Sequence, residues 1–123
     1  MGMIEDDLRG LLADHFDVDV CARIIPSEMA EGIVVQEIGG RYSSAGIRRT
    51  YHLISVMGIS MNENTAGQRM RAARDYLTAS IPATIGGTHY YTAKAQADGK
   101  LDFKGLNGPR YVEYVDMEVA TSL

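Results

Sequence analysis

The sequence predicts one α+β domain in which a mainly antiparallel sheet of four to six strands packs against two helices. Three observations predict this class. Two stretches repeat apolar residues at helical spacing, several others alternate apolar and polar residues as strands do, and 123 residues is the size of one ordinary domain. No linker, internal repeat or low-complexity tract divides residues 1–123, so we expect a single domain.

The first helix is predicted near residues 3–16, followed by a strand over 18–25 that stops at Pro26. The helix carries an apolar stripe at helical spacing: Ile4, Leu8, Leu11, Leu12 and Phe16. Its acidic start at residues 5–7 suits the positive end of the helix dipole. The strand alternates apolar and polar residues and is expected to be half buried.

The middle of the chain predicts two further strands joined by a hairpin connection. The first covers 32–38 and ends at Gly39-Gly40, where the chain is free to turn, and residues 41–46 form the connection. The second covers 47–60. Its latter half has no fully polar face, so we expect it to be covered on both sides.

The second helix should begin after Ser60, because Ser60-Met-Asn-Glu63 fits a capping box in which the Ser60 and Glu63 side chains reach each other's backbone. Its buried stripe is apolar at helical spacing: Met70, Ala73, Leu77 and Ile81. Pro82 closes the segment, since a residue before proline avoids helical geometry.

The end of the chain predicts a terminal hairpin. Residues 101–104 and 111–119 form its strands, and Leu106-Asn-Gly-Pro109 forms its turn. Residues 84–97 are compatible with either a strand or an ordered loop.

Composition and charge argue against several classes of function. Twelve Lys and Arg against sixteen Asp and Glu give a net charge of −4, the opposite of the basic footprint of a dedicated nucleic-acid binder. The single Cys21 has no partner for a disulfide or a CxxC site. The acidic N-terminus and the lack of a long apolar run predict neither a signal peptide nor a membrane span.

Groups that could carry catalysis occur only singly, and we therefore expect no enzyme, no cofactor and no metal site. The three histidines lie on different predicted elements, without an HExxH or cysteine–histidine motif. The paired glycines lack the continuation of a phosphate-binding loop. The alternative is a small enzyme or ligand-binding domain with its cleft between the long helix and the sheet, and convergence of His52, His89 and Cys21 or Glu113 would favour it.

The charges are distributed unevenly along the chain. Residues 41–74 carry six arginines and one acid, whereas the first nineteen residues carry six acids and one arginine. Solvated helix faces and guarded strand edges account for such charges in many proteins. The functional interpretation is a contact between copies, in which the basic patch of one subunit meets the acidic edge of the next, and head-to-tail contacts of this kind close into rings.

The order of elements resembles that of the tail-terminator and minor capsid proteins of long-tailed bacteriophages. The resemblance rests on the N-terminal helix, the strands at 18–25 and 32–38, the Arg48-Arg49-Thr-Tyr-His-Leu-Ile-Ser-Val strand, the helix ending near Leu77, and the stretch 103–119. It implies a helix, a short hairpin, a long strand, a second helix and a closing hairpin with a Gly-containing tip. Six such subunits form a ring that caps the tail tube, ends its growth and joins the tail to the head.

The resemblance implies a structural virion protein, located at the head–tail junction after assembly in the bacterial cytoplasm. Its expected partners are other copies of itself, the tail tube protein and head–tail connector proteins, with DNA passing through the ring but no sequence-specific DNA binding and no membrane. A head-completion or stopper protein is the nearest alternative. For the subunit and tube contacts we predict Arg41 and Tyr42 in the Gly-rich connection, and Arg48 and Arg49 at the start of the long strand.

Overall fold

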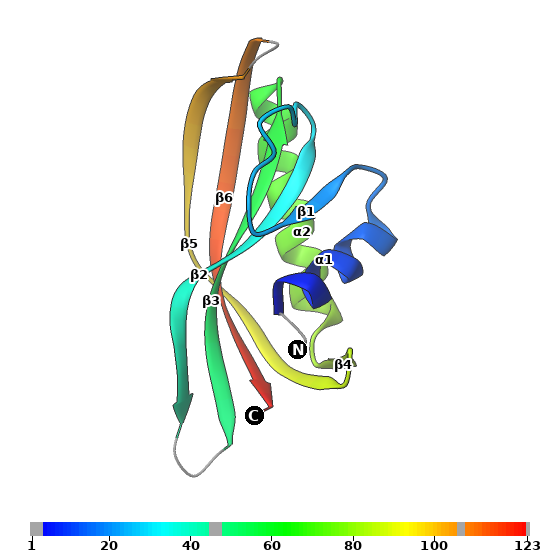
Figure 1. Ribbon diagram of the computed structural model, residues 1–123, viewed down its shortest axis with the longest axis vertical. Coiled ribbons are helices and arrows are strands. Elements are labelled where there is room, and N and C mark those ends of the chain that lie inside the picture. The colour runs from blue at the N-terminus through cyan, green and yellow to red at the C-terminus, as the bar shows by residue number, and fades with distance from the viewer. Residues whose placement is uncertain (1–3, 45–47, 106–107, 123) are drawn as a thin grey trace.

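The chain folds as two helices packed on one twisted six-stranded sheet (Figure 1). The computed structural model describes residues 4–44, 48–105 and 108–122, and describes their side chains except at 41–44, 101–105 and 108. The strand order is β1-β2-β3-β6-β5-β4, and only the β1–β2 pair is parallel. The predicted α+β class with a mainly antiparallel sheet is therefore confirmed.

Both predicted helices are present. Helix α1 spans Ile4–His15 and α2 spans Glu63–Ser80. The start of α2 differs from the predicted capping box, because Asn62 is the N-cap and its side-chain oxygen accepts a hydrogen bond from the Thr65 amide. Ser60 instead accepts from the Asn62 amide, which fixes the turn before the helix.

Of the two N-terminal strands, the first is shorter and the second is longer than predicted. Strand β1 covers only Val20–Ala22, because Arg23 adopts a φ of 78° and ends it. It pairs in parallel with β2, so the short hairpin implied by the resemblance is wrong at this point. Strand β2 covers Gly32–Ser44 and continues through Gly39-Gly40, which the sequence predicts as its end.

Two shifts of register explain why β2 does not end at its glycines. The shifts lie between Glu37 and Gly39 and between Gly39 and Tyr42, and both glycines have positive φ angles. Such bulges absorb extra residues while pairing continues. Residues 41–44 therefore belong to β2, which pairs here with β3, Arg49–Ser60. Residues 45 and 46 of the predicted connection, and Ile47, the predicted first residue of the next strand, lie outside the described residues.

Residues 84–97, which the sequence makes compatible with either strand or loop, belong to two strands joined by a short turn. After the short β4, Ala83–Ile85, strand β5 runs from Thr88 to Gly105 and pairs with β6, Gly108–Ser122. Of the predicted turn, Leu106 and Asn107 lie outside the described residues, whereas Gly108 and Pro109 belong to β6. The closing hairpin is thus longer than predicted.

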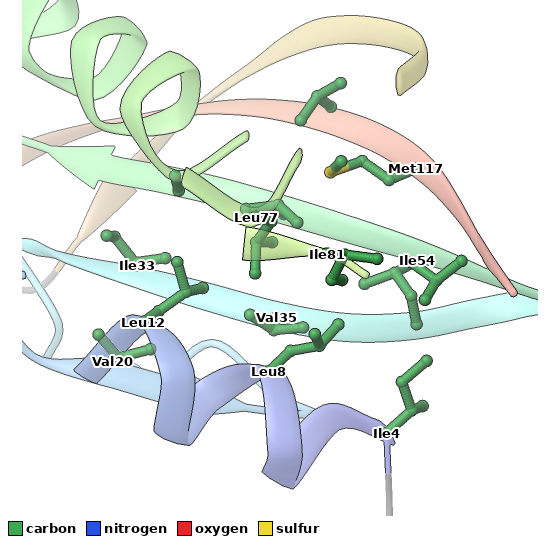
Figure 2. Close-up of a cluster of buried hydrophobic side chains, with 14 of the residues drawn as sticks. Ile4, Leu8, Leu12, Val20, Ile33, Val35, Ile54, Leu77, Ile81 and Met117 are labelled. Atoms are coloured by element: carbon green, nitrogen blue, oxygen red, sulfur yellow. The ribbon is translucent and has the colours of Figure 1, made fainter. Parts of the chain in front are cut away.

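The main core lies between the helices and one face of the sheet (Figure 2). Side chains from α1, including Leu8 and Leu12, point at β2, while Leu77 and Ile81 from α2 and its C-cap reach the same layer. The predicted stripe of α2 is buried throughout, as is the latter half of β3. Burial of each such large side chain contributes roughly 1.5–3 kcal/mol.

A second, smaller cluster covers part of the opposite sheet face. Val34 pairs with Met57, Ile59 pairs with Val112, and Met29 from the loop between β1 and β2 closes over them. The Arg110 guanidinium holds that loop in place by donating to the Met29 carbonyl at 2.8 Å and to the Pro26 carbonyl at 3.0 Å. Burial on both faces explains why β3 lacks a polar face.

Candidate assembly surface

The four residues predicted to make contacts lie at one end of the sheet, on the hairpin formed by β2 and β3. Arg41 and Tyr42 belong to β2, Arg48 precedes β3, and Arg49 is its first residue. The register places Ser44 opposite Arg49 and Tyr42 opposite Tyr51. The backbone thus brings the two predicted pairs together, while the side chains of Arg41 and Tyr42 lie outside the described residues.

The two arginines at the start of β3 have different surroundings. The Arg49 guanidinium lies 4.2 Å from the centre of the Tyr91 ring, and His89 packs edge-on against the same ring at 4.6 Å. Arg48 is exposed, has a φ of 54°, and makes no hydrogen bond or ion pair within the part of the chain that the structure describes. Arg48 is therefore available to a partner, whereas Arg49 already stabilises the sheet through β5.

A buried polar connection lies under this end of the sheet. His52 on β3 places Nδ1 2.8 Å from a carboxylate oxygen of Glu37 on β2, and Nε2 3.1 Å from the hydroxyl of Thr121 on β6. Glu5 on α1 adds a fourth element, because its carboxylate accepts a 2.8 Å hydrogen bond from the Glu37 amide. Side chains thus join three strands and a helix where the sheet continues toward the predicted contact residues.

The carboxylate, imidazole and hydroxyl of this connection follow the order found in hydrolytic triads. Here the hydroxyl belongs to Thr121, which is only 4% exposed, and His52 is 8% exposed. A substrate carbonyl could not approach the Thr121 oxygen without displacing surrounding strands. The arrangement therefore acts as a structural tie in this conformation, satisfying polar groups that would be costly to bury alone.

The acidic start of α1 is occupied by contacts within the chain. Asp6 lies 2.9 Å from the Arg23 guanidinium, and the hydrogen bond and charge of Asp6 raise the pKa of Arg23. The Tyr90 hydroxyl donates a 2.7 Å hydrogen bond to Asp7. Burial, reinforced by Asp7, raises the pKa of Tyr90. Asp6 and Asp7 thus have partners within the chain. Three later acids of the first nineteen residues are exposed and remain the candidates for the predicted acidic edge: Asp14, Asp17 and Asp19.

The arginines of α2 do not form one patch with those of the hairpin. Arg69 bonds to Glu31 and donates to the Ile59 carbonyl at 2.8 Å, which anchors α2 to the end of β3. Burial tends to raise the pKa of Glu31, but hydrogen bonds from Arg69, the Met61 amide and Ser60 outweigh it, so the pKa is lowered. Arg74 pairs with the neighbouring Asp75 at 2.9 Å.

A small hollow lies between α2 and the β5–β6 hairpin, where the ligand-binding alternative places its cleft. Its volume is about 180 Å³, less than the roughly 300 Å³ at which sites for small molecules usually begin. The residues that line it come from both layers: Met70, Arg71, Asp98, Gly99, Lys100 and Glu113.

Of the cluster that would favour the enzyme alternative, only Glu113 borders this hollow. His52 bonds to Glu37 and Thr121, His89 contacts Thr84 and Tyr91, and Cys21 packs against the smaller hydrophobic cluster. The four side chains therefore have separate surroundings. Within the described ranges no three His, Cys, Asp or Glu side chains are grouped as metal ligands would be.

Comparison of the sequence with protein-family models and with curated proteins finds no match. Among the described residues, neither helix has the length and apolar character needed to cross a membrane.

Sequence reasoning missed two features of this surface. The contact between Arg49 and Tyr91 joins residues on strands that are not neighbours in the chain, and the link from His52 to Thr121 spans 69 positions. No local spacing signals either contact. The exposed Ile38, on the other hand, sits beside Gly39-Gly40 in the sequence, and an apolar residue next to turn-forming glycines is a signal that could have directed attention to this edge.

Proposed function

We propose that this chain is a structural virion protein of the tail-terminator kind, which forms a ring that caps the tail tube, ends tail elongation and joins the tail to the head. The single observation that carries this proposal is the order of its elements. A helix, a long internal strand, a second helix and a long closing hairpin occur in the order that the resemblance leads us to expect, whereas the parallel pair β1–β2 stands where the resemblance implies a short hairpin. Gly105 and Gly108 are paired at the end of that hairpin, in keeping with its expected Gly-containing tip.

The shape of the subunit also supports an assembly role. The two hairpins lie at opposite ends of the elongated sheet, and the helices cover one side of it (Figure 1). The β2–β3 end carries the predicted contact residues and is tied internally by His52 and Arg49. A rigid end of this kind can present side chains to a partner at little cost in ordering entropy. We assign Arg41 and Tyr42 at this end to the tail tube and Arg48 to the contact between copies, with DNA passing through the ring.

A tube-capping assay tests the proposed function. Purified protein added to polymerising tail tubes should arrest their growth at a defined length, and particles lacking it should carry overgrown or unjoined tails. Replacing Arg41 and Tyr42 with alanine should leave a folded, ring-forming protein that no longer caps tubes, because Arg and Tyr side chains are frequent energetic centres of interfaces.

The control for this assay is the double variant Gln68→Ala and Asp75→Ala on the exposed surface of α2, which should cap normally. Normal tail length with the Arg41 and Tyr42 variant would overturn the assignment of this end of the sheet. Tubes that elongate unchanged in the presence of the native protein would overturn the proposed function itself. Protein that joins heads without affecting tube length would instead identify the head-completion alternative.

A further inference from the structure

The sheet has an open edge along β5. Strand β4 pairs only with residues 88–90, whereas β5 continues to Gly105 and its other side is occupied by β6. No strand pairs with the outer side of residues 92–105 within the described parts of the chain. All five residues from Lys94 to Asp98 are exposed, in contrast to residues 88–93, which are partly covered or, at Tyr90, fully buried. Such an edge offers backbone donors and acceptors to another strand.

One stretch of this edge carries little that would prevent pairing. Soluble proteins commonly protect long edges with proline, or with charges at the centre of the strand. Residues 88–105 contain no proline, and the longest uncharged part of the exposed edge is Ala95-Gln96-Ala97, between Lys94 and Asp98. Three further charged residues lie closer to the β5–β6 hairpin end: Lys100, Asp102 and Lys104. A register shift between Ala95 and Ala97 turns the strand locally. The small side chains leave room for a larger apolar side chain to pack against them.

The opposite edge of the sheet opens beyond the middle of β2. Strand β1 covers Ile33–Val35, the Arg23 amide donates to the Val35 carbonyl at 2.8 Å, and Glu5 receives the Glu37 amide. Beyond these contacts, no other described strand pairs with the outer side of β2. Ile38 lies where this opening begins and is 45% exposed, an unusual position for a large aliphatic side chain on a strand.

The two open edges are suited to each other. Each adjacent pair from β2 to β5 is antiparallel, so β2 and β5 run in opposite directions. A second copy in the same orientation, placed beside the first by rotation, therefore presents β2 antiparallel to β5. This head-to-tail contact uses a different surface on each partner and can close into a ring.

We propose that the open end of β2, beginning at Ile38, adds as a strand to the β5 edge of a second copy, with Ile38 lying opposite the uncharged stretch Ala95-Gln96-Ala97. The inference rests on the proposed ring function and specifies which edges join its subunits. Backbone hydrogen bonds supply the affinity of such strand addition and side-chain contacts set its register. The assembled ring would then contain a sheet that continues from subunit to subunit.

Disulfide trapping tests this contact in the full chain, on a background in which Cys21 is replaced by serine. The variant Ile38→Cys with Gln96→Cys should form covalent dimers and higher multimers under mild oxidation, seen as a ladder on a non-reducing gel. Each single variant should form no ladder. The control pair Ile38→Cys with Gln68→Cys carries its second cysteine on the exposed surface of α2 and should also form none.

A second variant tests the same edge without cysteine. Ala97→Lys places a charge in the uncharged stretch of the open edge and should weaken self-association at least tenfold, while Ala72→Lys at an exposed position of α2 should leave it unchanged. Thermal unfolding curves of both variants check that the subunit still folds.

The possible outcomes separate the inference from the function on which it rests. A ladder from the Ile38 and Gln96 pair, together with weaker association of Ala97→Lys, supports the inference. Covalent dimers from Gln96→Cys alone would overturn the inference, and so would rings detected by light scattering when the Ile38→Cys and Gln96→Cys variant gives no ladder. Either result would leave the proposed function standing. A native protein that stays monomeric alone and with tail tubes would overturn both.

Discussion

At the scale of single residues, the fold depends on polar side chains that join elements distant in sequence. Asp7 and Tyr90 are 83 positions apart, and their hydrogen bond ties α1 to the sheet. His52 connects β3 to β2 and β6 in the same region. Buried hydrogen bonds of this kind contribute about 1 kcal/mol each, and more when one partner is charged. The first contact positions α1, and the second joins the strands, next to the surface that we assign to assembly.

Replacing Tyr90 with phenylalanine should lower the free energy of unfolding by about 1–3 kcal/mol, because Asp7 loses its buried donor. The native protein should also lose stability as the pH rises above about 10, where tyrosine in the unfolded chain ionises. Its pKa is raised in the folded state, so the folded protein retains a proton that the unfolded chain releases, and stability falls with rising pH.

Denaturant unfolding of both proteins between neutral pH and about pH 11 measures this effect. The gap in stability between native protein and Tyr90→Phe should narrow as the pH increases. A gap that stayed constant across this range would mean that the pKa of Tyr90 is not raised in the folded protein.

Arg48 is the residue best suited to a direct test of the charged contact between copies. Its exposed side chain has no ion pair among the described residues, so Arg48→Glu should weaken self-association at least tenfold and shift the melting temperature little. Arg49→Glu should in addition cost about 0.5–1 kcal/mol of stability through loss of its contact with Tyr91.

Sedimentation and thermal melting measure the two properties separately. Arg48→Glu should change self-association alone, whereas Arg49→Glu should change both self-association and the melting temperature. Tyr91→Leu is the control that removes only the ring contact. A collapse of the melting temperature in Arg48→Glu would place Arg48 in the internal network and contradict its assignment to the interface.

At the scale of elements, close packing of α2 on β3 depends on a glycine. A Cβ atom at Gly58 would come within 2.6 Å of the Met70 amide nitrogen and closer still to the Ala66 carbonyl oxygen. Both are backbone atoms of α2 and cannot rotate away. The helix can therefore approach the strand this closely only where the strand carries no side chain.

Gly58→Ala should therefore destabilise the fold by about 2–4 kcal/mol, within the range for overpacked or strained core positions. Gly10→Ala is the matched control, since a Cβ at Gly10 meets nothing within 4 Å and alanine should stabilise α1 by about 0.5–1 kcal/mol. Equilibrium unfolding compares the two. Equal effects of the two substitutions would show that α2 can move away from β3 without loss.

Local patterns predicted the elements of this chain better than their boundaries. The stripes of α1 and α2 follow directly from helical spacing because each helix buries one face. The sequence predicts Ser60 as the N-cap of α2, whereas the structure has Asn62 there. Both residue types accept backbone hydrogen bonds, and only the path of the chain selects one of them. Gly39-Gly40 predicts a turn, but β2 continues through these glycines, because two bulges keep it paired with β3.

At the scale of the whole molecule, the shape of the sheet links the fold to the proposed assembly. The main core holds both helices on one face, and the smaller cluster under the loop that Arg110 anchors covers part of the other. Among the described residues, no strand pairs with the outer side of the end of β2 or of most of β5. The sequence could not predict this arrangement, because edge positions depend on strand order, which arises from contacts between distant segments.

The central claim, that this chain is a subunit of a ring, is tested most directly by size-exclusion chromatography with light scattering over a wide range of concentrations. The account predicts a closed species whose mass is a fixed multiple of the 13.4 kDa chain, six-fold by the resemblance, either in the protein alone or in the complex released from capped tubes. A protein that remains at the mass of one chain at every concentration, and adds no defined multiple when tail tubes are present, would contradict it.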